Sequence, residues 1–366
     1  MSFESGLIGF RMCYALKGLP DDAVDRFARH AAPPLKLLGT APAVGWVGGR
    51  HLFDLPISDN NARFGGYLRL SLLKAERKVP ASLLRAESFM EELAYMKAEK
   101  KPFLERKVRS DIRKQVMSRL LPQMPPTLRA IPFVHDERGG VVYVGAASEQ
   151  QMDAFRVNFL AATGVDLIPV NVETAVAQRR GGKARQWAPA SFSPEAADDE
   201  MENQPGQDFL TWLWFASEDR AGIFESREHG QIAVALEGPL LLERAGDGAH
   251  VIALREGLPT ASAEAQTALM TGKKLRRAKL TLACQDDTWT TSFDADSFAF
   301  RVKLPDPKEA LDPASRFQER IQKLGVFREM FFELFDQFLD DRCDERNWAK
   351  AQKKIHQWAA TRATRK

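Results

Sequence analysis

The 366-residue chain has 44% hydrophobic and 28% charged residues, which is normal for a globular protein and long enough for two or three domains. No apolar run of about 18 residues occurs, and the first residues lack the pattern of a signal peptide, so neither a membrane span nor secretion is expected. The three cysteines, Cys13, Cys284 and Cys343, are far apart, which argues against a disulfide framework and favours a reducing cytoplasm. The net charge of +3 permits nucleic-acid binding without requiring it.

Residues 1–78 have the pattern of mixed α and β structure. Pro20 is followed by two aspartates, and this predicts a helix start because proline and acidic residues both favour a first helical turn. The predicted elements are strands at 6–14 and 67–73, a glycine-rich strand or turn at 44–53, and a helix at 20–31.

Two amphipathic helices are predicted between residues 79 and 121, with a break near Lys101 and Pro102. Pro80 and Ser82 favour the helix start, and Pro122 ends the run. The predicted apolar stripes are Phe89, Leu93 and Met96 on the first helix, and Leu104, Val108, Ile112, Val116 and Leu120 on the second. A lone helical pair is marginally stable, so we expect this arm to dock against protein, including a second copy of the chain.

The second of these helices has a basic face. Arg106, Arg109 and Arg113 lie at positions i, i+3 and i+7, which places them on one side of the helix. Residues 100–119 contain eight lysines or arginines and two acidic residues, a net +6, whereas the whole chain is only +3. The candidate anion-binding residues are Lys100, Lys101, Arg106, Lys107, Arg109, Arg113 and Lys114. Such a face suits an anionic polymer, although an ordinary solvated helix has the same pattern.

Strands flank the arm on both sides in the sequence. After it, strands are predicted at 131–134, 141–146 and 167–172, and a helix at 149–162. The economical fold is one α+β domain made of residues 1–78 and 122–172, with mixed or antiparallel sheets and packed helices. Residues 79–121 project from it as a helical excursion.

A change of composition separates a second domain at 208–366. Residues 173–207 are rich in Ala, Pro, Glu and Asp, and are predicted to be a flexible linker, although the basic run at 178–185 could contact a polyanion. The predicted elements of the second domain are an apolar helix or buried strand at 208–218, strands at 231–236, 240–244, 250–254, 279–284, 288–293 and 298–302, helices at 260–271 and 317–339, and a basic tail at 350–366. The helix at 317–339 carries an aromatic stripe that indicates core or subunit interface: Phe327, Phe331, Phe332, Phe335 and Phe338.

A second basic cluster follows the helix at 260–271. Its candidate residues are Lys273, Lys274, Arg276, Arg277 and Lys279, with Arg255 one helix earlier. Five cations within seven residues cannot all point into a core, so we expect a basic wall that faces the same opening as the arm. Such a wall binds phosphates without reading bases, and a solvated strand edge is the alternative.

The common catalytic motifs are missing from the sequence. The six histidines are scattered, and neither a P-loop nor a Gly-x-Ser-x-Gly elbow occurs. Asp286, Asp287, Asp294 and Asp296 are the best enzyme-like feature, because clustered carboxylates can hold two divalent metals for phosphodiester hydrolysis. Aspartates at strand ends also make turns, and we expect that role here. No catalytic residue, metal or cofactor is assigned.

Several stretches of the sequence resemble a known family. They are GWV at 45–47, AERKVPASLLRAE at 75–87, SRLLPQMPP at 118–126, GGVVYVGAAS at 139–148 and LIPV at 167–170. Together with the charged arm, they are similar to the RdgC family of recombination-associated DNA-binding proteins. The resemblance covers residues 1 to about 172 and continues more weakly through GKKLRRAKLTL at 272–282.

The resemblance implies a ring-shaped homodimer that encircles double-stranded DNA without strong sequence preference and limits the access of a RecA-type recombinase. It implies a central α+β domain, a helical tip at 79–121 and a base domain at 208–366, with basic residues around the opening and dimer contacts at tip and base. Shorter family members often have an aromatic residue after the LLP exit, where this chain has Gln123, Met124 and Pro125, so the tip contact is expected to differ.

We therefore expect a non-enzymatic DNA-binding protein of the cytoplasm, associated with the nucleoid, whose partners are double-stranded DNA and a second copy of itself. No membrane partner is expected. Two alternatives stay open. One is a metal-dependent nuclease that uses the four aspartates, and the other is a protein-interaction scaffold whose basic faces meet acidic partners.

Overall fold

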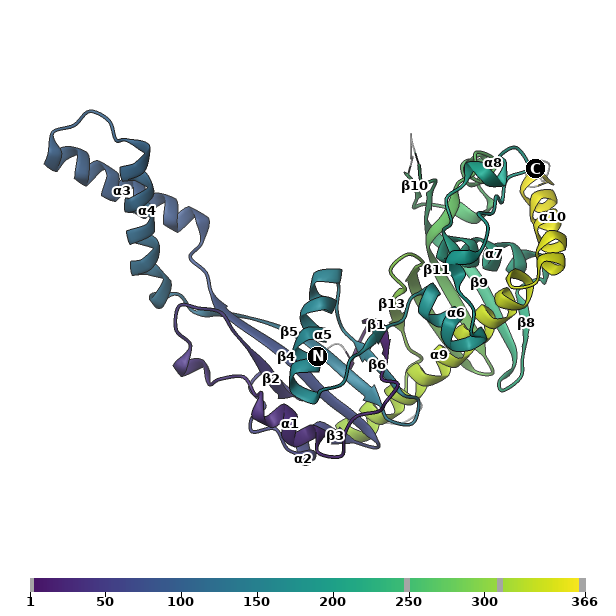
Figure 1. Cartoon of the computed structure of the whole chain (residues 1–366), viewed down its shortest axis with the longest axis horizontal. Helices are drawn as coiled ribbons and strands as arrows, with labels where there is room; N and C mark the ends of the chain where they lie inside the picture. The colour runs from purple at the N-terminus through teal and green to yellow at the C-terminus, as the bar shows by residue number, and fades with distance from the viewer. Residues whose placement is uncertain (1–2, 247–250, 308–311, 362–366) are drawn as a thin grey trace.

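The computed structural model describes residues 3–246, 251–307 and 312–361. The molecule is a crescent in which a helical arm and a larger base rise from the two ends of a central region (Figure 1). Its helices and antiparallel strands confirm the predicted α+β class. None of the described helices is long and apolar enough to cross a membrane. His250, where one strand was predicted to begin, and residues 362–366 of the basic tail lie outside the described residues.

The central region is formed from both sides of the arm. Its strands are β1 (Ile8–Tyr14), β2 (Ala43–Gly48), β3 (Arg63–Phe64), β4 (Tyr67–Arg77), β5 (Pro126–Asp136), β6 (Val141–Val144) and β7 (Ile168–Pro169). Its helices are α1 (Ala23–Arg29), the short η1 (Leu35–Leu37), α2 (Asp59–Ala62), α5 (Glu149–Thr163) and α6 (Val172–Arg180). The arm comprises α3 (Ala81–Glu99), α4 (Arg106–Leu120) and the short η2 (Leu121–Gln123).

The base contains the remaining elements. Its strands are β8 (Ile223–Ser226), β9 (Gly230–Glu243), β10 (Val251–Leu254), β11 (Lys274–Cys284), β12 (Asp287–Asp294) and β13 (Ala299–Lys303). Its helices are η3 (Ala184–Gln186), η4 (Asp198–Glu200), α7 (Pro205–Asp219), η5 (Pro259–Ala261), α8 (Ala263–Met270), α9 (Pro313–Arg342) and α10 (Glu345–Thr361). Ser262 is the N-cap of α8, because its side chain accepts a hydrogen bond from the Ala265 N–H, which has no partner within the helix.

One continuous antiparallel sheet joins the two regions, in the order β10-β9-β11-β12-β13-β1-β6-β5-β4-β2. The joint is β1, a single strand used twice. Residues 8–10 pair with β13 of the base, and residues 11–14 pair with β6 of the central region. The two predicted domains therefore share a strand instead of being connected only by a linker.

Aromatic side chains pack α1 and α5 against one face of the central sheet. Trp46 on β2 and Phe133 on β5 meet Phe27 from α1 and Phe155 and Phe159 from α5, with ring centroids 4.8–6.3 Å apart. All five rings are buried. The arm and α5 rise on the same side of this sheet (Figure 1).

The 30-residue helix α9 lies on the opposite side and spans both regions (Figure 1). Near its start, Phe317 packs on Phe64 of the central region with ring centroids 5.9 Å apart. Further along, the Arg328 guanidinium donates hydrogen bonds to Asp136 at 3.0 Å and to the Tyr143 hydroxyl at 3.1 Å. Helix α9 thus belongs to the central region as much as to the base.

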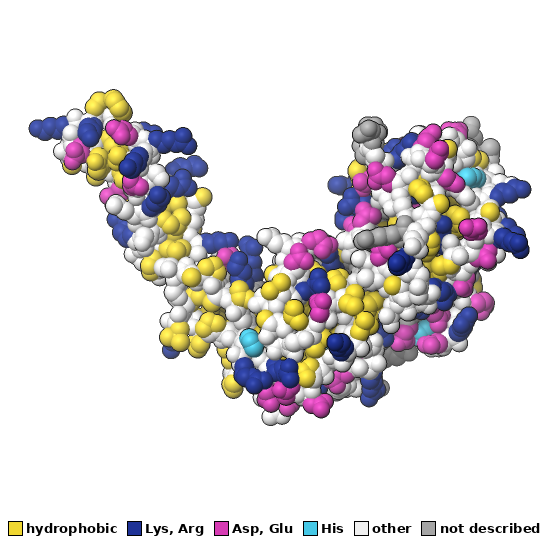
Figure 2. Space-filling model, viewed as in Figure 1, with side chains coloured by type: hydrophobic (Ala, Val, Ile, Leu, Met, Phe, Trp, Pro, Cys, Tyr) yellow, Lys and Arg dark blue, Asp and Glu magenta, His cyan; other side chains and the backbone are white. Residues whose placement is uncertain are grey.

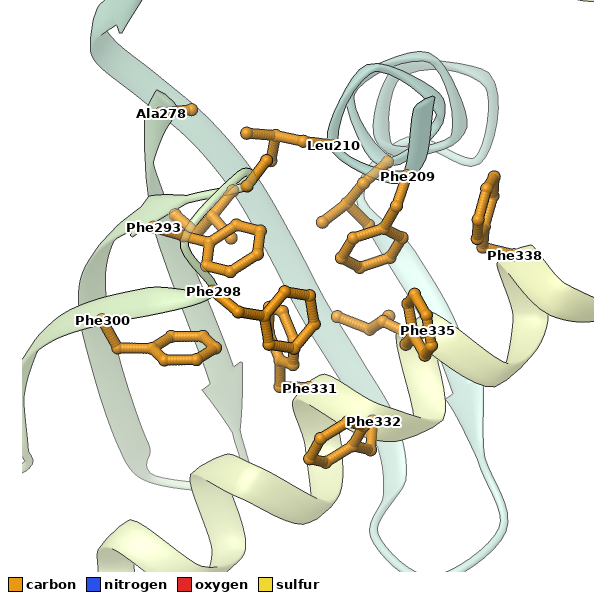
Figure 3. Packing of buried hydrophobic residues seen from close by; sticks show 14 of the residues in the cluster. Phe209, Leu210, Ala278, Phe293, Phe298, Phe300, Phe331, Phe332, Phe335 and Phe338 are labelled. Atoms are coloured by element: carbon orange, nitrogen blue, oxygen red, sulfur yellow. The ribbon is translucent and has the colours of Figure 1, made fainter. Parts of the chain in front are cut away.

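The second half of α9 forms the core of the base. Phe331, Phe335 and Phe338 point toward Phe209 of α7 and toward phenylalanines of β12 and β13 (Figure 3). The centroids of Phe209 and Phe335 are 5.0 Å apart, and those of Phe300 and Phe331 are 4.9 Å apart. The aromatic stripe seen in the sequence is therefore core, one of its two predicted roles.

Residues 173–207 are not the flexible linker that their composition predicted. Ala190 and Phe192 are fully buried, and the Phe192 ring packs on Trp348 of α10 at 5.9 Å. The Ser191 carbonyl accepts a hydrogen bond from Gln352 at 3.2 Å. A segment without periodicity can still be ordered when its few apolar side chains and its backbone groups find partners on neighbouring helices.

The arm extends from a long pair of strands. β4 and β5 pair from Tyr67 to Arg77, and the Arg77 guanidinium also donates a hydrogen bond to the Met124 carbonyl just after η2. The stripe predicted on α4 is largely buried against α3, where it packs with Leu84. The stripe predicted on α3 is wrong in part. The contact face of α3 follows residues 84, 88, 92 and 96, so Phe89 and Leu93 lie about 100° further round and are 58% and 47% exposed.

Candidate nucleic-acid interface

The arm exposes most of the cations that the sequence nominated. Lys100 and Lys101 lie in the turn after α3, and the others follow along α4. The exposed residues are Lys100, Lys101, Arg106, Lys107, Arg109, Arg113 and Lys114. Lys and Arg side chains occur along the arm, including the side that faces the base (Figure 2). This distribution places positively charged side chains on the inner side of the arm.

Carboxylates on α3 neutralise some of the cations on α4. Arg119 forms ion pairs with Glu87 at 2.9 Å and Glu91 at 2.8 Å, and Arg109 lies 3.6 Å from Glu92. These pairs fix α4 to α3. Within the described part of the chain, no carboxylate pairs with Arg106, Lys107 or Arg113, so these three cations remain available to an external anion.

A hollow beside α4 combines cations with hydroxyl groups. It has a volume of about 420 Å³, and its polar lining residues are Thr40, Ser110, Arg113, Lys114 and Ser118. Hydroxyl and guanidinium donors together are typical of contacts to phosphate oxygens. The three hydroxyl residues were not predicted from the sequence to be binding residues. Thr40 belongs to a loop about 70 positions before α4, and the fold places this loop beside α4.

A larger groove of about 870 Å³ lies where the two halves of the sheet meet, on the side opposite α9. Four arginines and three carboxylates line it: Arg11, Arg276, Arg277 and Arg301, with Glu149, Asp294 and Asp296. Arg11 pairs with Glu149, whereas Arg301 has no carboxylate partner among the described residues. Neither Arg11 nor Arg301 was predicted from the sequence to be part of the interface. In the sequence, each of these arginines is a charged residue at an outward position of a largely apolar strand. This pattern is too common to indicate a binding site.

The second basic cluster does not form the exposed wall that the sequence predicted. Lys273 and Lys274 are buried, with 8% and 2% of their surface exposed. The Lys274 ammonium lies 2.6 Å from the fully buried Asp208 carboxylate, and Arg342 lies 3.9 Å from the same carboxylate. From Lys274 on, the run is part of strand β11 beneath α7, and two register irregularities in the pairing of β11 with β9 change which side chains face inward.

The other cations of this cluster are paired with acids on neighbouring strands. Arg276 contacts Glu243 at 2.7 Å, Arg277 contacts Asp294 at 2.5 Å, and Lys279 contacts Glu237 at 2.6 Å. The hydrogen bond that Arg276 donates to Glu243 raises the pKa of Arg276. Arg255 is exposed at the end of β10. Of this group, Arg276 and Arg277 line the groove, and Lys273 and Lys274 are removed from the candidate interface.

The four aspartates do not form one site. Asp286 and Asp287 lie at one end of the β11–β12 hairpin, while Asp294 and Asp296 lie at its other end, about 24 Å away along seven residues of strand. Asp294 accepts hydrogen bonds from the Ser297 N–H and hydroxyl, as in a turn. Burial opposes ionisation of Asp294, but hydrogen bonds from Arg277 and Ser297 outweigh it and lower its pKa. Burial raises the pKa of Asp296.

The crescent, the exposed cations of the arm and the arginine groove define a candidate surface for a polyanion. Residues 41–180, which include the whole arm, match the sequence model of a family described as "RdgC: Putative exonuclease, RdgC". The match confirms the resemblance to the RdgC family over those residues, while almost all of the base lies outside it. No curated protein matches the chain.

Proposed function

We propose that the chain binds the phosphate backbone of double-stranded DNA without sequence preference, as a homodimeric ring around the duplex. The observation that carries the proposal is the position of the unpaired cations. Arg106, Lys107 and Arg113 on the arm and Arg301 in the groove have no carboxylate partner among the described residues, and arm and groove lie on the α5 side of the sheet. Phosphate contacts need long cationic side chains on a concave surface and no base-reading helix.

Apolar side chains on the arm support the dimer. Three large apolar side chains of the arm, Phe89, Met90 and Phe103, are 58%, 66% and 70% exposed to solvent. Exposed apolar surface of this kind favours an arrangement in which a partner covers it. A two-fold axis would place the same patch of a second copy against them. Two crescents that meet at their ends enclose an opening, and DNA held there would be less accessible to a recombinase. We place this activity in the cytoplasm, at the nucleoid.

The salt dependence of DNA binding tests the proposal. Each neutralised phosphate contributes about 0.9 to the slope of log K against log salt. Replacing Arg106 and Arg113 with alanine removes two cations from each of two copies, so the slope should flatten by about 3 to 4 and affinity should fall equally for all sequences. Fluorescence anisotropy with two unrelated duplexes at several salt concentrations measures both quantities. As a control, Lys353→Ala with Lys354→Ala removes two exposed cations from α10, at the outer edge of the base (Figure 1), and should leave the slope unchanged.

The same samples separate the competing functions. The family description names an exonuclease, so labelled DNA should be incubated with magnesium and its length measured. We expect retention without shortening. Shortening that is lost in Asp296→Asn would replace the proposal with the nuclease alternative. Absence of DNA binding in the wild type would leave the scaffold alternative, in which the basic surfaces meet acidic proteins.

A further inference from the structure

A group of three metal-binding side chains lies on a part of the base that the proposed DNA surface does not use. Glu228 and His229 belong to the turn between β8 and β9, and Glu329 lies in the middle of α9. One carboxylate oxygen of each glutamate and a ring nitrogen of His229 all lie within 4.8 Å of one another. The turn and the helix are separated by about 100 residues in sequence, so this arrangement is a product of the fold.

The histidine is held in place by its backbone. The His229 N–H donates a hydrogen bond to the Ser226 hydroxyl at 2.8 Å, and its carbonyl accepts one from the Cys284 thiol at 3.4 Å. The Nε2 atom is buried and makes no hydrogen bond within the described part of the chain. It lies 3.5 Å from a Glu329 carboxylate oxygen. A buried polar nitrogen without a hydrogen bond costs free energy, and a bound cation on this nitrogen would remove that cost.

Glu329 is oriented as well. Its other carboxylate oxygen accepts a hydrogen bond from Arg328 at 3.2 Å, which leaves the first oxygen directed toward His229. A metal ligand is commonly fixed by such an outer hydrogen bond. Both Glu228 and Glu329 also line a cavity of about 480 Å³, which provides an entry path and room for a water ligand.

We propose that Glu228, His229 and Glu329 bind one divalent transition-metal ion, with Zn²⁺ the best match, and that this ion ties the β8–β9 turn to α9. Imidazole nitrogen with two carboxylates suits Zn²⁺, whereas Mg²⁺ prefers oxygen ligands and retains several waters. Zn–N and Zn–O bonds of about 2.1 Å place tetrahedral ligand atoms about 3.4 Å apart. The three ligand atoms lie within 4.8 Å of one another, so a bound ion would draw them closer together, and water from the cavity would complete the coordination.

Titration of the metal-free, tag-free full-length protein with Zn²⁺ tests the site. Isothermal titration calorimetry should show one ion per chain, and thermal unfolding should move to higher temperature with Zn²⁺, because a ligand that binds only the folded state stabilises it. His229→Ala and Glu329→Gln should each weaken Zn²⁺ binding at least about tenfold, since even an outer-sphere change costs that much. A large excess of Mg²⁺ should not displace the ion. His51→Gln, which changes an exposed histidine of the central region, is the matched control and should bind Zn²⁺ as the wild type does.

Two results would overturn the proposal. The first is no saturable Zn²⁺ binding in the wild type, which would leave His229 and Glu329 as a simple ion pair. The second is unchanged binding in the His229 and Glu329 variants, which would place the ion elsewhere. Because Glu228 is exposed, Glu228→Gln should leave the base folded, and circular dichroism checks the fold of every variant. Its Zn²⁺ affinity therefore decides the question if the other two variants misfold.

Discussion

The buried charges in the base show that the residue type alone does not predict whether a cation is exposed. Lys274 belongs to a run of five cations, and nothing local indicates that Asp208, 66 positions earlier, will neutralise it. Arg277 and Asp294 are direct partners across β11 and β12, and so are Lys279 and Glu237 across β11 and β9. A one-dimensional count of charges cannot see such partners, because strand register is set by the whole sheet. The sequence could predict that cations were dense here, but not that most were already paired.

Lys274→Ala should destabilise the protein without altering DNA binding. Removing one member of a buried pair leaves an uncompensated charge, which costs about 3 to 5 kcal/mol. Lys279→Ala is the matched control, because its pair with Glu237 is about half exposed and should contribute less than about 1 kcal/mol. Chemical denaturation measures both variants. A Lys274 variant as stable as the wild type, with weaker DNA binding, would restore this residue to the interface.

His135 should make the protein sensitive to mild acid. Both ring nitrogens are buried without hydrogen-bond partners among the described residues, and burial lowers the pKa from its ordinary 6.5, against the opposing effect of Glu137 and Asp136. The unfolded chain therefore takes up a proton as the pH falls below about 6.5 while the folded chain does not, so stability is lost in that window. His135→Leu should raise the unfolding temperature, and should raise it more at pH 5 than at pH 8. Parallel pH profiles for variant and wild type would contradict this.

At the scale of elements, the two helices of the arm show when periodicity is informative. The stripe of α4 has one apolar face, and its prediction was right. Helix α3 carries apolar residues on two faces, and the face that packs against α4 is the one through Leu84 and Ser88. The sequence alone cannot rank the two faces, because the choice depends on how α4 returns. The face left over, with Phe89 and Leu93, is the one that a second copy could cover.

Phe89→Ala with Leu93→Ala should weaken dimerisation while the arm remains helical. Both side chains are exposed in a single copy, so their truncation removes little packing within the chain. Truncation of an aromatic side chain at the centre of an interface can cost about 2 kcal/mol or more of association free energy. Light scattering over a range of concentrations measures the shift from dimer to the 41.0 kDa monomer. Leu37→Ala, which truncates a residue of the central region that is 76% exposed, is the control. A wild type that is monomeric at micromolar concentration would remove the ring from the proposal.

For the whole molecule, local patterns predicted the α+β class and the helical excursion, but not how the halves are joined. The pairing of β1 with β13 connects Ile8 to Val302 and has no local signature. Helix α9 was assigned to the base, and its contacts to Asp136 and Tyr143 appear only in three dimensions. Residues 173–207 were wrongly predicted to be a flexible linker for the same reason, because their order comes from contacts with α9 and α10. Interactions between distant segments, not element types, account for most of what was missed.

The shared strand β1 also has a consequence for biosynthesis. Its first three residues leave the ribosome about 290 residues before their partners on β13, and at about 5 to 20 residues per second this takes roughly 15 to 60 s. Throughout that time the nascent central region has an open strand edge, which is the kind of surface that pairs with other chains. We therefore expect the newly made N-terminal half to need protection by a chaperone until the last strand is translated, and a chain truncated before residue 299 to aggregate.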